Sequence, residues 1–258
     1  MRSLKRFRLI TFDVTNTLLQ FRTTKGKQYG DIGALFGVRC DDSKLVKNFK
    51  ANWYKMNQAY PNFGREIKPQ MEWQQWWRIL IADTFEDSGA AIPAEKLNDF
   101  SNHLIELYQT TMCWEPCNGS VDLLKQIRKT EPQIKLGVIA NFDPRLNVLL
   151  KNTKMDQYLD FAINSYEVKA EKPSKVIFER ALIESKLPNI KPQECLHIGD
   201  GPTTDYLAAK QAGWNALLVH EKSVRYLAEK YGDDIQRNHV FPSFYDFQKK
   251  LNSDSVVW

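Results

Sequence analysis

The apolar segment from Phe7 to Phe12 constrains the fold more than any other feature, because it leads directly into the carboxylate of Asp13. The segment has the length and composition of a buried β-strand. Open α/β sheets place their chemistry at the carboxyl ends of such strands, where a small polar turn follows. Asp13 is therefore a candidate nucleophile, with the chemistry needed to attack a phosphoryl group.

Short apolar runs alternate with helical patterns from about residue 118 to the end. Asn118-Gly119-Ser120 is a predicted N-terminal cap for the first of these helices. The predicted strands cover 134–140, 161–163, 195–199 and 214–219, and the predicted helices cover 121–129, 174–185, 203–212 and 243–251. This alternation predicts an α/β fold in which a Rossmann-like, mainly parallel sheet carries helices on both faces.

The segment from 22 to 115 shows no strong strand pattern and is predicted to be helical. Its expected helices cover 25–37, 43–59, 69–87 and 94–111. The chain thus leaves the sheet after its first strand and returns later. We expect an α/β core of residues 1–20 and 116–258, with residues 21–115 inserted as a helical cap domain. Trp73, Trp76 and Trp77 share one helical face, which favours a small bundle anchored by aromatic side chains.

Composition excludes several classes of protein. The 258 residues have a net charge of +5 that is not gathered in a stripe, so no nucleic-acid partner is expected. No apolar run reaches the roughly 18–20 residues of a membrane span. The four cysteines lack zinc-site spacing, which favours reduced thiols and a cytoplasmic or nuclear location. Cleavage of the basic N-terminus as a presequence is not expected, since it would remove the first strand.

Four polar motifs follow predicted strands or lie between them. Asp13 is followed by Thr17, Ala140 by Asn141, and Lys172 lies in a Glu-Lys-Pro turn. The fourth motif, Gly-Asp-x-x-x-x-Asp, contains Asp200 and Asp205. Each match is weak alone, whereas all four in this order and spacing form a specific pattern.

This pattern resembles the haloacid dehalogenase superfamily of hydrolases, with a helical cap after the first strand, and the likeness covers essentially the whole chain. The resemblance implies that Asp13 is the nucleophile and a Mg²⁺ ligand. It implies that the backbone carbonyl of Thr15 and the side chain of Asp200 are further ligands. Asp205 would be another ligand or a support for the site. Oxygen donors of this kind suit Mg²⁺.

The same resemblance implies roles for three more residues. Thr17 would hydrogen-bond the region of the nucleophile. Lys172 would neutralise both Asp13 and a bound phosphoryl oxygen, although a Lys-Pro pair alone is usually a solvated turn. Asn141 would donate hydrogen bonds to a substrate phosphate or carboxylate, although an Asn after a strand is often a turn former.

Two residues depart from the pattern of the superfamily's phosphatases. Thr15 stands where an aspartate would protonate the leaving group and then activate water, and its hydroxyl does not titrate near pH 7. Ala140 stands where a Ser or Thr hydroxyl usually binds phosphate.

We therefore expect an Mg²⁺-dependent hydrolase of the phosphatase branch, weak or specialised in activity, that acts on a small phosphorylated substrate. The alternative is a non-catalytic protein that binds a phosphorylated ligand or partner. Dehalogenation is less favoured, because dehalogenases lack the metal loop that carries Asp200 and Asp205. The expected assembly is a monomer or homodimer.

Overall fold

The computed structural model describes residues 2–220 and 224–258, and the chain divides into two compact units. The first unit comprises Met1–Gln20, Pro116–Asn141 and Lys154–Trp258, and the second comprises Phe21–Glu115 and Phe142–Thr153. We call them the α/β unit and the helical unit.

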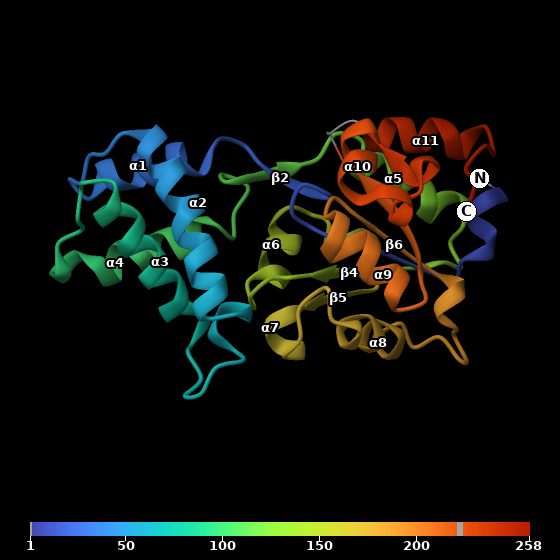
Figure 1. The fold of residues 1–258 in the computed structure, drawn as a ribbon, viewed down its shortest axis with the longest axis horizontal. Helices are drawn as coiled ribbons and strands as arrows, with labels where there is room; N and C mark the ends of the chain where they lie inside the picture. The colour runs from blue at the N-terminus through green and yellow to red at the C-terminus, as the bar shows by residue number, and fades with distance from the viewer. Residues whose placement is uncertain (1, 221–223) are drawn as a thin grey trace. The chain divides into compact units, whose positions relative to one another are not determined.

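The α/β unit is built on a six-stranded parallel sheet with the order β5-β4-β1-β6-β7-β8 (Figure 1). Its strands are β1 (Leu9–Phe12), β4 (Lys135–Ala140), β5 (Phe161–Asn164), β6 (Cys195–Gly199), β7 (Asn215–Val219) and β8 (Val240–Phe241). The predicted fold class is confirmed. Strand β1 pairs with β4 on one side and β6 on the other, which puts the residue after β1 between two neighbouring strand ends.

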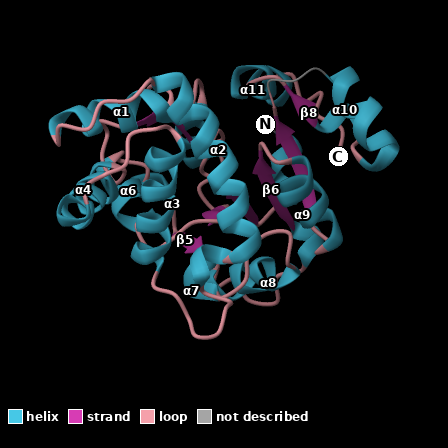
Figure 2. Cartoon of the chain, turned by 60° about the vertical axis from the view of Figure 1, so that its left-hand side comes forward, coloured by secondary structure: helices cyan, strands magenta, loops and turns pink. Residues whose placement is uncertain are grey.

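The helices of this unit surround the sheet, as Figure 2 shows in cyan and magenta. They are α5 (Ser120–Thr130), α7 (Ser165–Val168), α8 (Lys175–Glu184), α9 (Ala208–Gln211), α10 (Val224–Tyr231) and α11 (Phe244–Asn252). Phe178 of α8 and Ala208 of α9 belong to one buried cluster with Leu9 and Ile139 of the sheet. Burial of these apolar side chains is what holds the helices on the strands.

Four elements of this unit differ from the sequence prediction, and one of them is α7, which was not predicted. The helix predicted over 203–212 is a π-helical turn, η5 (Pro202–Leu207), followed by α9. Helix α10 and the two-residue strand β8 were not predicted. The predicted cap segment Asn118-Gly119-Ser120 contains the N-cap of α5, which is Gly119, with φ +81° and no side-chain bond. The Ser120 hydroxyl instead donates to the carbonyl of Leu18 at 3.0 Å.

The helical unit contains five α-helices in the described part of the chain. They are α1 (Lys25–Leu35), α2 (Asp42–Ala59), α3 (Trp73–Asp87), α4 (Ala94–Leu107) and α6 (Leu146–Asn152). Helix α1 ends earlier than predicted, since Gly37 takes a left-handed conformation with φ +78°. Helix α3 starts later than predicted, with Glu72 as its N-cap. Short 3₁₀ turns complete the chain: η1 (Arg2–Arg6), η2 (Asn62–Gly64), η3 (Asp156–Tyr158), η4 (Pro192–Glu194), η6 (Gly232–Asp234) and η7 (Arg237–His239).

Residues 142–153, which the sequence analysis placed in the α/β core, group with the helical unit instead. Polar contacts account for this. The buried carboxylate of Asp143 accepts a hydrogen bond from Trp77 Nε1 at 2.8 Å. It also pairs with Arg145, whose guanidinium donates to the carbonyl of Ile105 at 3.1 Å. The sequence of 142–153 by itself gave no sign of these partners in other segments.

Two short strands were also missed. Strands β2 (Leu19–Phe21) and β3 (Trp114–Pro116) pair as a separate two-stranded sheet where the chain passes between the units. Three residues each are too few for a period-two pattern to stand out.

The aromatic core of the helical unit agrees with the interpretation of its tryptophans as packing residues. Trp76 is fully buried, and its ring lies 5.2 Å from the rings of Trp53, Phe63 and Trp77. Its indole Nε1 donates to the carbonyl of Tyr60 at 2.9 Å, which satisfies the one polar group that burial would otherwise leave unpaired.

Within residues 2–220 and 224–258, none of the helices has both the length and the apolar character required to cross a membrane.

Asp160 is expected to be a local stability determinant of the α/β unit. Its carboxylate accepts hydrogen bonds from Leu136 N, Arg128 and Lys135 at 2.7–3.0 Å. Burial alone would raise the pKa of Asp160, but these partners lower it below the ordinary value of 3.8. We expect Asp160→Asn to reduce the free energy of unfolding at neutral pH by about 1–3 kcal/mol, as measured by urea denaturation.

The effect of Asp160→Asn should depend on pH. A carboxyl with a lowered folded-state pKa stabilises above its unfolded pKa, and this contribution is lost as pH falls through the folded value. The difference between wild type and variant should therefore shrink in acid. Asp156→Asn, at an exposed position, is the matched control. Equal unfolding free energies of wild type and Asp160→Asn at pH 7 would contradict this assignment.

Candidate active site

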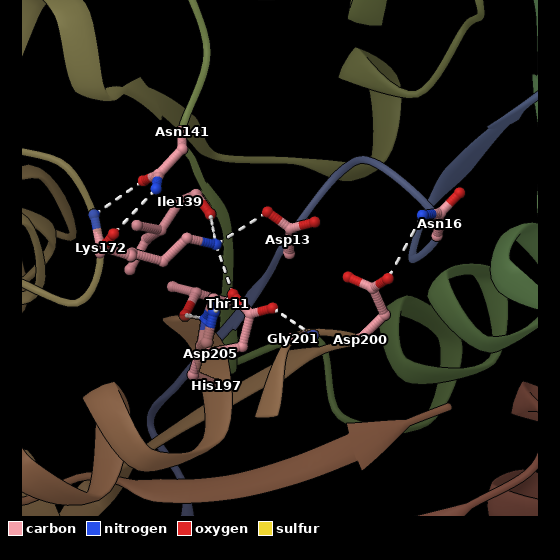
Figure 3. Close-up of polar contacts among 10 residues, drawn as sticks. All are labelled: Thr11, Asp13, Asn16, Ile139, Asn141, Lys172, His197, Asp200, Gly201 and Asp205. Atoms are coloured by element: carbon pink, nitrogen blue, oxygen red, sulfur yellow. Dashed lines mark hydrogen bonds and ion pairs between the residues drawn. The ribbon is translucent and has the colours of Figure 1, made fainter. Parts of the chain in front are cut away.

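The carboxyl ends of three adjacent strands bring the predicted site residues of the α/β unit together (Figure 3). Asp13 follows β1, Asn141 follows β4, and Asp200 follows β6. Asp205 lies four residues beyond Gly201, inside η5. The carboxylate oxygens of Asp13, Asp200 and Asp205 lie within 4.8 Å of one another.

Lys172 is the centre of this arrangement. It lies in the loop between α7 and α8, far from Asp13 along the chain. Its ammonium group donates to Asp13 Oδ1 at 2.7 Å, to Asp205 Oδ1 at 2.5 Å and to the carbonyl of Ile139 at 2.8 Å. All three of its N–H donors are thus used, and the residue is only 3% exposed. Burial alone would lower the pKa of Lys172, but the two aspartates raise it, so the group is a fixed positive charge.

Asp205 is held from several sides. Its Oδ2 accepts from the backbone N–H of Gly201 at 2.7 Å, and its Oδ1 lies 3.1 Å from His197 Nε2 as well as against Lys172. Burial would raise the pKa of Asp205, yet Lys172 and His197 hold it well below its usual range. With both oxygens engaged, Asp205 suits the supporting role better than direct metal ligation.

His197 and Thr11, which were not predicted as site residues, extend this chain of hydrogen bonds into the sheet. Both are fully buried, on β6 and β1, and Thr11 Oγ1 lies 2.8 Å from His197 Nδ1. Burial lowers the pKa of His197, so the ring is neutral. The carboxylate of Asp205 can only accept, so Nε2 carries the proton and Nδ1 accepts from Thr11. The available signal was two polar residues inside otherwise apolar strands.

Asp13 and Asp200 are neighbouring carboxyl groups, and the pKa values of both are raised. Burial raises the pKa of Asp13 to about 6, although Lys172 opposes the shift. Burial also raises the pKa of Asp200, to about 7, and the charges of Asp13 and Asp205 add to it. Asn16 Nδ2 opposes this second shift by donating a hydrogen bond to Asp200 Oδ2 at 3.3 Å.

These residues fit a divalent cation with oxygen ligands. Asp13 and Asp200 each offer a carboxylate oxygen to a common point, and their pKa values are raised first by burial and then by the neighbouring carboxylates. A hard cation such as Mg²⁺ takes a few carboxylates of this kind and keeps several waters.

The turn after Asp13 is fixed by its own backbone. Asn16 adopts a left-handed conformation with φ +58°, which asparagine tolerates, and its N–H donates to the carbonyl of Leu19 at 2.7 Å. Thr15 is half-buried in this turn. Thr17 is fully buried, and its hydroxyl has no hydrogen-bond partner among the described residues. The predicted hydrogen bond from Thr17 to the nucleophile region is made by its backbone, whose N–H donates to the carbonyl of Val14 at 3.2 Å.

The side chain of Asn141 has a partner that the sequence did not predict. Its amide donates to the carbonyl of Lys172 at 2.8 Å and accepts from the N–H of Lys172 at 2.7 Å. The side chain thus holds the loop that carries the lysine, which leaves one amide hydrogen for a ligand. Ala140, beside it, is buried and brings no hydroxyl to the site.

A buried lysine bonds to Asp13 at one strand end and to Asp205 in the following helical turn, with Asp200 at the adjacent strand end, and this arrangement defines a class of α/β protein. Members of this class have an acidic, lysine-supported site suited to a cation and an anionic substrate. Residues 7–213 match the haloacid dehalogenase-like hydrolases, and the chain belongs to this family.

Individual relatives agree with the assignment. The chain is 74% identical to the rhythmically expressed gene 2 protein of Drosophila melanogaster, over all of both chains. It is 30% identical to haloacid dehalogenase-like hydrolase domain-containing protein 3 of Xenopus laevis, over 92% of each. Among solved structures, it matches the putative HAD-hydrolase YfnB of Bacillus subtilis, bound to magnesium, with a TM-score of 0.65 and 16% identity. That match covers 96% of this chain and 100% of the other.

Proposed function

We propose that the protein is an Mg²⁺-dependent phosphohydrolase that acts on a small phosphorylated metabolite through an aspartyl-phosphate on Asp13. The observation that carries this proposal is the position of Lys172, whose buried ammonium touches Asp13 and Asp205 at once. One fixed cation beside a nucleophile and its supporting carboxylate suits a transferring phosphoryl group, whose charge must be balanced in the transition state.

In the first step, a carboxylate oxygen of Asp13 attacks phosphorus, and the bond from phosphorus to the leaving oxygen breaks with its electron pair. Lys172 balances charge on the phosphoryl oxygens while Asn141 holds the lysine's backbone in place. When bound by Asp13 and Asp200, Mg²⁺ would supply further positive charge to these oxygens.

In the second step, water attacks phosphorus, the bond to Asp13 breaks, and inorganic phosphate leaves with the Asp13 carboxylate restored. Both steps need a proton carrier, first toward the leaving oxygen and then away from water. Thr15 cannot fill that role, and proton transfer is typically worth about 10²–10⁴-fold. We therefore infer a preference for acyl or aryl phosphates, whose leaving groups need little protonation.

The test is phosphate release by wild-type protein from 4-nitrophenyl phosphate and from an alkyl phosphate, with Mg²⁺ and with a chelator. We expect Mg²⁺-dependent turnover of the aryl ester and much slower turnover of the alkyl ester. Turnover that is unchanged by the chelator would contradict the metal assignment. Faster turnover of the alkyl ester would contradict the role given to Thr15.

The second candidate function is binding of a phosphorylated ligand without turnover. Two residues favour it. Thr15 replaces the aspartate that would transfer protons, and Ala140 replaces the hydroxyl that would bind phosphate, whereas the acidic cluster for a cation is present. Saturable, Mg²⁺-dependent binding of an aryl phosphate with no product release over hours would favour this candidate over the enzyme. The cluster that contains Asp200 and Asp205 disfavours a dehalogenase function. Metal-independent release of chloride from 2-chloropropionate would be evidence for that function instead.

His197 is expected to be a positioning residue for this reaction, because it holds Asp205 and thereby Lys172. We expect His197→Leu to lower kcat about tenfold with little change in KM, since supporting partners of this kind are typically worth about 10–100-fold. His197→Gln, which keeps a donor, should recover part of the loss. The measurement is steady-state kinetics on 4-nitrophenyl phosphate.

A matched control separates this effect from stability. His239 is also buried and hydrogen-bonded, to Tyr206, but it lies outside the acidic cluster. His239→Leu should lower Tm without lowering kcat at a temperature where the variant is folded. If His197→Leu and His239→Leu have the same kinetics, His197 is only a structural residue.

A further inference from the structure

A second cationic feature lies in the helical unit, at the first turn of α1. The ammonium group of Lys25 lies over three aromatic rings: 4.8 Å from the ring centre of Phe21, 4.7 Å from Phe49 and 5.6 Å from Trp53. Phe49 and Trp53 are one turn apart on α2, so they present adjacent ring faces to the lysine. Helices α1 and α2 run beside each other in both views (Figures 1 and 2).

The partners that the structure describes for this ammonium group are aromatic rings. Within residues 2–220 and 224–258, neither a carboxylate nor a carbonyl pairs with Lys25, whereas Lys27 on the same helix forms an ion pair with Asp31. Ring faces attract a cation but accept none of its three N–H groups in the way an oxygen does. Burial, with no acidic neighbour to oppose it, lowers the pKa of Lys25 to about 8.

A hollow of about 300 Å³ opens beside this group. It is lined by Lys25, Val46, Phe49, Lys50 and Trp53. The lining thus combines two amines and two aromatic side chains with one aliphatic side chain, and it contains no acid. A lysine that merely covered apolar surface would turn its ammonium to water and keep an ordinary pKa. Here the charge stays among the rings, at the wall of the hollow.

We propose that this hollow is a binding site for a small aromatic anion, a flat ring that bears one carboxylate, sulfonate or phosphate group. The ring stacks on Phe49 and Trp53, and the anionic group accepts the free hydrogen bonds of Lys25. Lys50, exposed at the rim, adds charge of the same sign. Every lining residue belongs to the helical unit, so the site goes beyond the proposed phosphohydrolase function and uses none of its residues.

The experiment measures the Kd of naphthalene-2-sulfonate by isothermal titration calorimetry for the full-length protein. Lys25→Met keeps the length of the side chain and removes the charge, and we expect it to weaken binding about tenfold or more. Lys47→Met removes the same charge from an exposed position on α2 that does not line the hollow, and its Kd should match wild type. The neutral analogue 2-acetylnaphthalene should bind more weakly than the sulfonate.

Two more variants are needed. One distinguishes the effect of the Lys25 charge from that of its packing, and the other tests whether binding in the hollow is independent of the acidic site. Lys25→Arg retains the charge and should retain most of the affinity, which guards against a folding defect in Lys25→Met. Asp13→Asn should leave the Kd unchanged, so a failure here is separable from a failure of the proposed function. The proposal is overturned if wild type shows no saturable binding. Equal Kd values for wild type and Lys25→Met, or loss of binding in Asp13→Asn, would also overturn it.

Discussion

Asp13→Asn should reduce turnover of 4-nitrophenyl phosphate by at least about 10³-fold, the scale expected when a nucleophile is removed from groups that act as a unit. The amide cannot form the aspartyl-phosphate, and it also removes one of the two carboxylates available to a cation. Lys172 keeps its bonds to Asp205 and Ile139, so the fold of the site should persist. Burst kinetics and steady-state rates measure the effect.

A matched surface change gives the baseline for this prediction. Asp122 is exposed on α5, and Asp122→Asn should leave turnover unchanged. Thermal unfolding of both variants checks that loss of activity is not loss of fold. If Asp13→Asn retains more than about a tenth of the wild-type rate, the nucleophile lies elsewhere and the proposed mechanism is wrong.

Thr15→Asp is expected to raise turnover of unactivated alkyl phosphates by up to about 10²-fold, because it restores a group able to donate and accept the proton. The gain should stay below the full range of proton-transfer effects, since Ala140 still brings no hydroxyl to the substrate. Aryl phosphates should gain less. The measurement is kcat/KM for one alkyl and one aryl ester in wild type and variant.

The new carboxylate also carries an electrostatic cost. The pKa values of Asp13 and Asp200 are already raised to about 6 and about 7, first by burial, and another nearby negative charge would raise them further. Thr15→Asn has a similar size and no acid, so it isolates the proton transfer from changes in packing. Equal gains on both ester types, or an equal gain with Thr15→Asn, would contradict the account given for Thr15.

The sequence predicted the sheet and most of the acidic site because those features are local. An apolar run ending in a carboxylate marks both a buried strand and the end where a parallel sheet exposes its chemistry. Asp13 and Asp200 could be placed in this way. Asp205 was found from its spacing to Asp200 in the Gly-Asp-x-x-x-x-Asp motif, and Ser174 was recognised as the N-cap of the helix that follows it. Each signal lies within a few residues of the element it predicts.

Interactions between distant segments were not predictable in the same way. The hydrogen bonds between the Asn141 side chain and the backbone of Lys172, 31 residues away, were not predicted from the sequence. Residues 142–153 read as part of the α/β unit, yet the partners of Asp143 and Arg145 lie in helices that precede them by dozens of residues. Such contacts depend on which segments meet, and no local pattern records that.

The sequence by itself determined the strand-end positions of Asp13 and Asp200 and the absence of a carboxylate at Thr15, because these follow from residue type and period. The contact of Lys172 with Asp13 was expected from the resemblance to the family, whereas only the tertiary structure decided that Lys172 would also bond to Asp205 and that Thr11 and His197 would support Asp205 from inside the sheet. The physical reason is that a buried charge is stable only where its partners converge on it. That convergence comes from the packing of the strands and their loops, which no single segment encodes.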